Sequence, residues 1–275
     1  MGPTLVVLAA GLGSRFGGNK QVAAIGPGGR PLLAYGIHDA ARAGFARAVV
    51  VTRAELEPSL RTILSGADLP LEFTFQATRP GRPWGTGHAL LAAKGVVHEP
   101  FMVVNADDFY GAGTYRVLAE FLTSAAGVDS VAAGALATFP LGVTLSADGP
   151  VNRGVCRTED GTWLAGIEEV RGVVAGQREW PGDTPVSLNC WGFTPAIFPL
   201  VQQRFTAYLG AAPGEPDGEF MLPRAVNDLM DLGQLRVRLL QATGPWIGLT
   251  WPGDAPRAAA DLARMTAAGD YPATW

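Results

Sequence analysis

The feature that most constrains this chain is an apolar run at residues 5–10 that leads directly into a glycine-rich loop. The run, Leu-Val-Val-Leu-Ala-Ala, is typical of a strand buried on both faces of a parallel sheet. The loop after it holds glycines at positions 11, 13, 17 and 18, together with Arg15 and Lys20. Glycines let backbone N–H groups approach an anion closely, and the two cations neutralise its charge. Strand and loop together indicate an α/β fold with an anion-binding loop.

Lys20 belongs to a residue type that is rare in this chain. Only two of the 21 Lys and Arg residues are lysines, Lys20 and Lys94. A chain that uses arginine nearly everywhere has a lysine inside its glycine loop. This favours a role for a compact ammonium, which a guanidinium fork would not replace.

Composition excludes several classes of protein. The 275 residues are 48% hydrophobic, enough for one large α/β domain or two smaller ones, and the net charge of −4 argues against a nucleic-acid-binding surface. No apolar run approaches the roughly 18 residues of a membrane span, and no basic region precedes the first strand. Cys156 and Cys190 have no metal-site spacing, so we expect reduced thiols. We therefore expect a soluble cytoplasmic protein that binds neither nucleic acid nor membrane.

The order of apolar segments predicts a Rossmann-like α/β fold: a mixed, mainly parallel sheet with helices on both faces and β-hairpin insertions in the second half. In the first half we expect strands over 4–9, 48–51, 71–76 and 101–105, helices over 31–43, 55–64 and 86–94, and a loop over 78–83. After residue 129 we expect shorter strands, hairpin turns at 147–149 and 159–161, and a polar insertion over 172–185. The remaining expected elements are strands over 187–193 and 235–240 and helices over 198–209, 219–232 and 255–267.

The glycine loop allows three interpretations. A dinucleotide site requires Gly-x-Gly-x-x-Gly at the start of a helix, whereas here the spacing is Gly11-x-Gly13-x-x-x-Gly17 and the segment stays a loop until Pro31. A Walker A loop requires Gly-Lys-Ser/Thr at its end, which is missing. The third interpretation is a long glycine turn with surface cations.

The segment at residues 8–15, Leu-Ala-Ala-Gly-Leu-Gly-Ser-Arg, followed by Lys20-Gln21, resembles the signature of the sugar-1-phosphate nucleotidyltransferases. In that family the loop backbone wraps a nucleoside triphosphate, and the arginine and lysine grip its phosphates. The resemblance implies catalytic roles for Arg15 and Lys20. It implies nucleotide contacts from Ala9, Ala10, Gly11, Gly13 and Ser14. The family's proline before the lysine is Asn19 here.

A second segment, Gly85-Thr86-Gly87-His88-Ala89, resembles the family's Gly-Thr-x-x-Ala loop beside the nucleobase. The resemblance implies nucleotide contacts from Gly85 and Thr86, and from Gln76, which matches a glutamine that reads a pyrimidine edge. Structural alternatives exist. Thr86 is also a candidate N-cap of the following helix, and His88 a partly buried helix residue without a chemical role.

A third segment, Asn105-Ala-Asp107-Asp108, follows an apolar strand and resembles the family's Gly-Asp metal motif, with Ala106 in place of the glycine. Two adjacent carboxylates repel unless a cation lies beside them, and Mg²⁺ accepts one or two carboxylates together with phosphate oxygens. We expect Mg²⁺ as cofactor, with Asp107 and Asp108 as ligands. Many members of the family have a second carboxylate that binds metal, and Asp254 is the candidate for it here. The alternative role for Asp254 is the N-cap of the following helix.

The second half resembles the family's sugar-binding half. Arg153-Gly154-Val155 resembles its glycine-valine strand, and Ser187-Leu-Asn189 its Asn-x-Gly strand. Glu168-Glu169-Val170-Arg171 stands where many relatives have Glu-Lys-Pro. The resemblance implies sugar-binding roles for Gly154, Glu169, Asn189 and Arg171, the last in place of the missing lysine. It also implies one domain over residues 1–275, nucleotide-binding at 1–111 and sugar-binding at 112–275.

These segments predict an enzyme that transfers a nucleoside monophosphate, UMP or dTMP, from a nucleoside triphosphate to a sugar 1-phosphate and releases pyrophosphate. One alternative is a cytidylyl- or guanylyltransferase that acts on another small phosphate, such as phosphocholine bound by Trp191 or Trp246. The other is a non-catalytic nucleotide-sugar sensor. The sequence leaves the sugar and the oligomeric state open.

Overall fold

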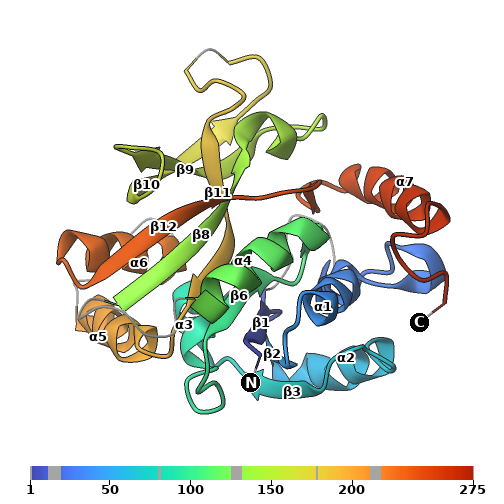
Figure 1. Ribbon diagram of the computed structural model, residues 1–275, viewed down its shortest axis with the longest axis horizontal. Helices are drawn as coiled ribbons and strands as arrows, with labels where there is room; N and C mark the ends of the chain where they lie inside the picture. The colour runs from blue at the N-terminus through green and yellow to red at the C-terminus, as the bar shows by residue number, and fades with distance from the viewer. Residues whose placement is uncertain are drawn as a thin grey trace.

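The computed structural model describes residues 2–11, 20–79, 82–124, 132–177, 179–210 and 218–274. The predicted nucleotide-binding residues Gly13 and Ser14 and the predicted catalytic residue Arg15 therefore lie outside the described residues, as does Asn19. The strands (Figure 1) are β1 Thr4–Leu8, β2 Arg47–Thr52, β3 Leu71–Phe75, β4 Thr78–Arg79, β5 Arg82–Pro83, β6 Phe101–Asn105, β7 Asp108–Phe109, β8 Ala132–Pro140, β9 Val151–Thr158, β10 Leu164–Val173, β11 Pro185–Phe193, β12 Leu235–Gln241 and β13 Ile247–Gly248. The helices are α1 Leu32–Arg42, α2 Glu57–Ile63, α3 Thr86–Leu91, α4 Ala112–Ser124, α5 Ile197–Gly210, α6 Leu222–Asp231 and α7 Asp254–Ala267.

One large sheet organises the molecule. Its main order is β10-β9-β11-β6-β1-β2-β3, and β8 pairs with both β11 and β12. Strands β6, β1, β2 and β3 run parallel, whereas β11 is antiparallel to β6, β8 and β9. The sheet is therefore mixed, with a parallel first half and a largely antiparallel second half, in which β12 runs parallel to β8. The predicted fold class is confirmed.

The two halves of the sheet meet at a fork on one edge of β11. Trp191 to Phe193 pair with β6, whereas Val186 and Ser187 pair with β9 along the same edge. Strand β6 ends at Asn105, and beyond that point β9 takes its place as the neighbour of β11. In Figure 1, β9 and β10 accordingly diverge from the parallel strands. The fork leaves space at the carboxyl end of β6.

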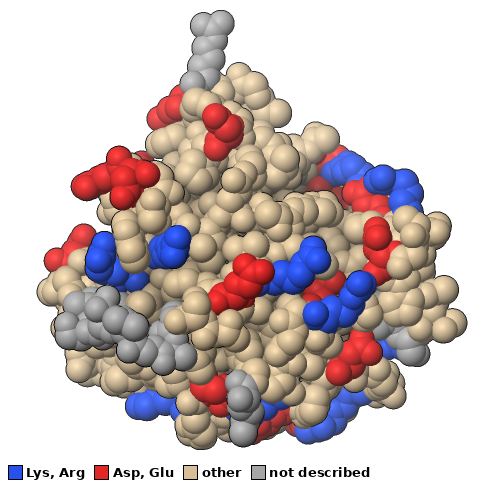
Figure 2. All heavy atoms as spheres, viewed as in Figure 1, with Lys and Arg blue, Asp and Glu red and all other residues tan. Residues whose placement is uncertain are grey.

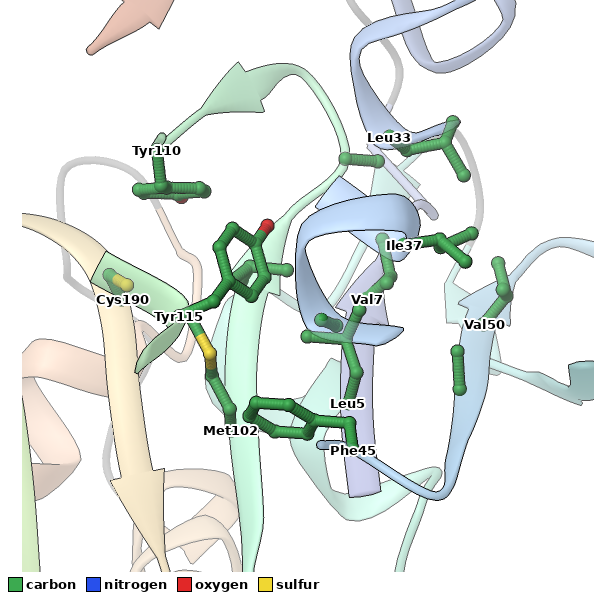
Figure 3. Close-up of a cluster of buried hydrophobic side chains, with 14 of the residues drawn as sticks. Leu5, Val7, Leu33, Ile37, Phe45, Val50, Met102, Tyr110, Tyr115 and Cys190 are labelled. Carbon is green, nitrogen blue, oxygen red and sulfur yellow. The ribbon is translucent and has the colours of Figure 1, made fainter. Parts of the chain in front are cut away.

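The alternation of side chains along the parallel strands explains why both faces of the sheet are covered. Leu5 and Val7 of β1 belong to one buried cluster, and Val6 and Leu8 to another on the opposite face. Figure 3 shows the first cluster, in which Leu5, Val7 and Val50 of the strands meet Leu33 and Ile37 of α1. Helices α1, α2 and α4 contribute to this cluster, and α3, α5 and α6 to the other.

Helix α7 docks beside α1 through a smaller cluster. Ala258 and Leu262 of α7 pack with Leu32 and Tyr35 of α1, and Tyr271 completes the contact. The Tyr271 hydroxyl donates a hydrogen bond of 2.9 Å to the buried Asp39 of α1. This docking fixes the segment 242–253, which connects β12 to α7 and contributes Trp246, Leu249 and Thr250 to the cleft described below.

Several sequence-based expectations were wrong in detail. Helix α4 was not predicted, although Tyr115, Leu118 and Leu122 form its buried stripe. Strands β8 to β11 have 8 to 10 residues, longer than the 5 or 6 of the parallel strands, whereas the sequence predicted shorter ones. The expected loop over 78–83 holds the short antiparallel pair β4–β5.

The charged side chains and the two cysteines lie as the composition of the chain leads one to expect. Acidic and basic side chains are interspersed over the face seen in Figure 2. Cys156 and Cys190 are both free and buried. In the part of the chain that the structure describes, no helix has the length and apolarity to cross a bilayer.

Candidate active site

A cleft of about 750 Å³ opens at the fork, where the carboxyl ends of β1 and β6 face β9, β10 and β11. Ligands in α/β sheets bind at this position, because parallel strands end there together. Eleven of the sequence-predicted site residues line the cleft: Ala10, Gly11, Lys20, Gln76, Gly85, Thr86, Asp107, Asp108, Gly154, Glu169 and Asn189. The cleft thus brings together residues predicted for the nucleotide, the metal and the sugar.

Lys20 connects the glycine loop to the end of β6. It begins a short 3₁₀ turn, Lys20–Val22, and the next residue, Gln21, donates a hydrogen bond of 2.9 Å to the Gly11 carbonyl. The Lys20 ammonium lies 3.8 Å from the Asp107 carboxylate and donates to the Leu249 carbonyl. The cation is therefore placed between the first strand, the Asp pair and the segment that follows β12.

Asp107 and Asp108 form a carboxylate pair with unequal surroundings. Asp108 Oδ2 accepts hydrogen bonds from the Asn105 amide at 2.9 Å and the Tyr110 hydroxyl at 3.2 Å. Burial raises the pKa of Asp107 against the effect of Lys20. Burial and the charge of Asp107 raise the pKa of Asp108, against the effects of Asn105, Arg153 and Tyr110.

The Asp pair fits a magnesium ion. Its donors are oxygens only, and two adjacent half-buried carboxylates with raised pKa values gain from a divalent cation between or beside them. Among the described residues no cluster of three or more His, Cys, Asp and Glu side chains is placed to hold a metal. Mg²⁺ needs no such cluster, because it completes its shell with water and phosphate oxygens.

Gln76 presents a single kind of hydrogen-bonding atom to the cleft. Its amide nitrogen donates to the Gly85 carbonyl at 2.9 Å and contacts His88 Nδ1 at 3.3 Å. Since an amide nitrogen only donates, Nδ1 of His88 accepts and the ring proton lies on Nε2. Burial lowers the pKa of His88, which favours this neutral ring. Both amide hydrogens of Gln76 are thereby used, and its carbonyl oxygen remains for a ligand.

The loop at Gly85 is held by the segment before α6. Gly85 has φ of 104°, and a Cβ there would lie 2.7 Å from the Phe220 carbonyl oxygen, so only glycine fits. The sequence-based alternative for Thr86 was wrong, because Gly85 is the N-cap of α3 and Thr86 its first residue. The Thr86 hydroxyl instead accepts a hydrogen bond of 3.0 Å from the Leu222 N–H at the start of α6.

On the opposite side of the cleft, Gly154 and Glu169 face each other across the β9–β10 pair. A Cβ on Gly154 would lie 3.8 Å from the Glu169 carboxylate and 2.9 Å from the Ile167 side chain. The Ile167 side chain therefore opposes a side chain at Gly154, and the exposed Glu169 carboxylate lies next to this buried part of β9.

Asn189 lies in a β-bulge of β11. The register shifts between Ser187 and Trp191, and Asn189 has φ of 60°, a left-handed conformation that residues other than glycine rarely adopt. Its amide oxygen accepts from the Trp191 indole at 2.9 Å, and its amide nitrogen donates to the Asn105 side chain at 3.3 Å. Strain of this kind is concentrated at functional sites. One amide hydrogen and one lone pair of Asn189 remain for a ligand.

Three predicted site residues, Ala9, Arg171 and Asp254, do not line the cleft. Ala9 is fully buried, with its N–H bonded to the Val51 carbonyl at 2.7 Å, so its side chain contacts no ligand. Arg171 is exposed on β10 and does not line the cleft.

The prediction of Asp254 as a metal ligand is not supported by its contacts. Its carboxylate accepts hydrogen bonds from the N–H groups of Thr250 and Trp251, from the Ser146 hydroxyl and from Arg257. Burial opposes these bonds, which together lower the pKa of Asp254. Asp254 is also not the N-cap, which is Gly253. The carboxylate closes the loop before α7 and stays away from the cleft.

Sequence reasoning assigned no role to Asn105 and Arg153, which line the cleft, and named Trp246, which also lines it, only as a candidate for a choline pocket. Asn105 and Arg153 adjoin predicted motif residues, so their position in the sequence was a signal. Arg153 is buried, and its guanidinium lies 5.2 Å from the centre of the Trp246 ring. No local pattern around residue 246 places that tryptophan beside β9.

Residues 5–148, just over half of the chain, match the MobA-like NTP transferase domain family. The chain belongs to this family. A comparison with curated proteins finds no match. The predicted membership in the nucleotidyltransferases is confirmed.

Two solved structures show that this NTP transferase shares its fold with sugar nucleotidyltransferases. One is a protein assigned as a glucose-1-phosphate thymidylyltransferase from Bacillus anthracis, solved with sucrose. Its TM-score is 0.65, with 16% identity over 94% of each chain. The other is a UDP-glucose pyrophosphorylase in complex with UDP-glucose. Its TM-score is 0.64, with 19% identity over 95% of this chain and 98% of that one.

The surroundings of the two candidate tryptophans argue against a choline site in this NTP transferase. Trp191 is fully buried and stacks on Phe193. Trp246 lines the cleft, but the guanidinium of Arg153 already lies over its ring. A ligand ammonium would compete with this fixed cation.

Proposed function

We propose that this NTP transferase is a sugar-1-phosphate uridylyl- or thymidylyltransferase that uses Mg²⁺. The observation that carries the proposal is the composition of one cleft. Lys20 and the Asp pair follow the central strands β1 and β6, Gln76 follows β3 toward one end of the sheet, and Asn189 and Glu169 lie on β11 and β10 toward the other. This arrangement provides, in order, contacts for a base, for phosphates and for the hydroxyls of a sugar.

The proposed reaction needs no nucleophilic side chain. An oxygen of the sugar phosphate attacks the α-phosphorus of the nucleoside triphosphate, a new P–O–P bond forms, and the bond to the β-phosphate breaks and releases pyrophosphate. The acceptor phosphate is already anionic, so no base is required. The protein must position the two substrates and neutralise their charge.

Each group in the cleft has a place in this scheme. Lys20 binds the triphosphate and stabilises the charge that develops on the leaving pyrophosphate, together with Arg15 as predicted from the sequence. Asp107 and Asp108 would hold Mg²⁺. When bound, Mg²⁺ supplies polarisation of the α-phosphate and neutralises its charge. Glu169 and Asn189 orient the sugar through its hydroxyls, and residues 1–111 and 112–275 act as nucleotide and sugar halves of one domain.

The polarity of Gln76 supports a uracil or thymine base. With both amide hydrogens used, Gln76 offers an acceptor to the base. Uracil and thymine carry a hydrogen on N3 that this acceptor can receive. Cytosine has no hydrogen on N3 and offers a donor only from its amino group on C4, at another position of the ring edge. Gly85 and Thr86, next to Gln76 in the cleft, complete the base contact.

A pyrophosphate-release assay tests the proposal. The four ribonucleoside triphosphates and dTTP are each combined with Mg²⁺ and a panel of sugar 1-phosphates, with phosphocholine as a further acceptor. We expect release with UTP or dTTP and a sugar 1-phosphate. Release with CTP and phosphocholine would instead show the cytidylyltransferase alternative. Binding of nucleotide sugars without release in any combination would show a sensor.

A further inference from the structure

The second half of the cleft contains a buried cation that the sequence did not single out. Among the described residues that line the cleft, the cations are Lys20 and Arg153. Lys20 lies beside Asp107, on the side of the glycine loop. Arg153 lies on β9, next to Gly154 and directly across from Val170 of β10.

The surroundings of Arg153 place it between the metal side and the sugar side. Burial lowers the pKa of Arg153, and the charges of Asp108, Glu169 and Asp254 act against this effect. Glu169 and Gly154 face each other on one surface of the β9–β10 ribbon, whereas Arg153 and Val170 face each other on the other surface. Arg153 nevertheless lines the same cleft as Glu169, Asn189 and the Asp pair, so its guanidinium is available to a ligand bound there.

The guanidinium is held in a fixed orientation. Nε donates to the Thr144 hydroxyl at 3.0 Å, Nη1 to the Asn152 carbonyl at 2.7 Å, and Nη2 to the Thr144 carbonyl. These bonds use three of the five guanidinium N–H groups. One hydrogen on each terminal nitrogen remains, which is the pair that a phosphate accepts in bidentate fashion. Because the arginine side chain is already ordered, the binding of a ligand costs little side-chain conformational entropy.

We propose that Arg153 binds the phosphate of the acceptor substrate and positions its attacking oxygen near the Asp pair. This inference rests on the proposed function, because it assigns a residue to the acceptor of that reaction. It replaces Arg171, which the sequence predicted for this role and which lies exposed outside the cleft. The acceptor class that fits is a phosphate monoester carried by a polyhydroxyl group, whose hydroxyls meet Glu169 and Asn189.

The first test measures anion binding without turnover. Wild-type protein is loaded with Mg²⁺ and the α,β-imido analogue of UTP, which occupies the triphosphate side, and is titrated with inorganic phosphate in a calorimeter. We expect binding that weakens on the order of 10-fold in Arg153→Lys and 100-fold in Arg153→Gln, since a charge-assisted bidentate contact is lost. Arg157→Gln, an exposed arginine on the same strand, is the matched control and keeps wild-type affinity.

The second test separates binding from a merely structural role. In the pyrophosphate-release assay, Arg153→Lys should raise the KM for the sugar phosphate about 10-fold and leave the KM for the nucleoside triphosphate within about twofold. A structural role alone would lower the Tm and change both KM values alike. Should Arg153→Gln fail to fold, Arg153→Lys retains the charge and carries both tests.

Three results would overturn the inference. They are wild-type phosphate affinity in both Arg153 variants, no phosphate binding to the wild-type protein, or a larger loss in Arg171→Gln than in Arg153→Gln. A lack of pyrophosphate release with every substrate pair would overturn the proposed function, and the calorimetric comparison would still report on Arg153. The two failures are therefore distinguishable.

Discussion

The Lys20 ammonium lies 3.8 Å from the Asp107 carboxylate, so a residue of the glycine loop is paired with the end of a strand more than 80 residues away. The pair combines a cation suited to phosphate oxygens with a carboxylate suited to a metal. In the absence of substrate each partially neutralises the other. Substrate phosphates would replace Asp107 as the partner of Lys20, and a metal ion would replace Lys20 as the partner of Asp107. The binding of the phosphates and the binding of the metal ion are therefore linked.

Replacement of Lys20 should affect turnover more than binding. We expect Lys20→Ala to lower kcat on the order of 100- to 1000-fold, because a charge that stabilises the leaving pyrophosphate is lost, while the KM for the sugar phosphate changes little. Steady-state kinetics with both substrates varied checks this. The control is Lys94→Ala, the other lysine, which is exposed and outside the cleft. Equal losses in kcat and in sugar binding would contradict the assigned role.

The Asp pair should control the magnesium dependence. We expect Asp107→Asn and Asp108→Asn each to lower kcat/KM at least 100-fold and to shift the Mg²⁺ activation curve to higher concentration, because a carboxylate ligand becomes a neutral amide. Activity is measured across a magnesium titration. Asp183→Asn, at an exposed position outside the cleft, should leave the curve unchanged. An unshifted curve in both pair variants would remove them from the metal site.

The contact between His88 and Gln76 should set base preference. In His88→Leu the acceptor for one amide hydrogen of Gln76 is lost, so the amide is free to turn and offer a donor to the base. We expect kcat/KM for UTP to fall about 10-fold and the preference for UTP over CTP to narrow. His88→Asn restores an acceptor and is the matched control. The hypothesis fails if the leucine variant keeps the wild-type ratio of UTP to CTP.

Gly85 should tolerate no side chain. Its φ of 104° and the 2.7 Å approach of a Cβ to the Phe220 carbonyl both oppose Gly85→Ala. We expect the free energy of unfolding to fall by about 1–3 kcal/mol and the Tm to fall by several degrees, as measured by thermal unfolding. Gly95→Ala is the control, because a Cβ at Gly95 meets nothing within 4 Å. A Tm equal to that of the wild type would show that the loop can shift.

Asp39 should make stability depend on pH. Burial raises its pKa from 3.8 to about 7, against the Tyr271 hydrogen bond and the charges of Arg42 and Arg116. Between these values the folded protein holds a proton that the unfolded chain has released, so stability falls as pH rises from about 4 to 7. The effect amounts to at most about 4 kcal/mol. Urea unfolding at several pH values measures the slope.

Asp39→Asn should remove this contribution, because the amide oxygen still accepts from Tyr271 while no proton is exchanged. The variant should therefore be more stable than the wild type at pH 8 and similar to it at pH 4. Asp231→Asn, exposed at the end of α6, should leave the slope as it is. A slope that survives in Asp39→Asn would place the titrating group elsewhere.

The parallel half of the sheet could be predicted because its signals are local. The strand at Phe101–Asn105 was predicted with both ends correct, and the other first-half strands within one or two residues. Continuous apolar runs between amphipathic helices suffice for such strands. The positions of Lys20, Gln76 and Asp107 in one cleft follow from the same topology, since parallel strands end on one edge.

The remainder of the site depends on register between distant strands, which local patterns do not encode. The left-handed Asn189 arises from a bulge in β11 that is set by pairing with β8. Arg153 reaches the cleft because it faces Val170 in β10 and meets Thr144, whereas Arg171 was the nearer candidate by motif. The start of the helix at Asp254 was predicted within one residue. The hydrogen bonds of its carboxylate to the preceding N–H groups of Thr250 and Trp251 were not predicted.

The fork on β11 bears on whether the chain can be divided. Strand β11 comes from the second half of the chain, yet it supplies the hydrogen-bonding partner of β6 in the first half. A polypeptide ending at residue 111 would leave the edge of β6 unpaired, where strands of other molecules can add and cause aggregation. The complementary piece, residues 112–275, would lack the strands that form one side of the cleft. Separately expressed halves should therefore be insoluble alone and regain activity only when produced together, as in fragment complementation.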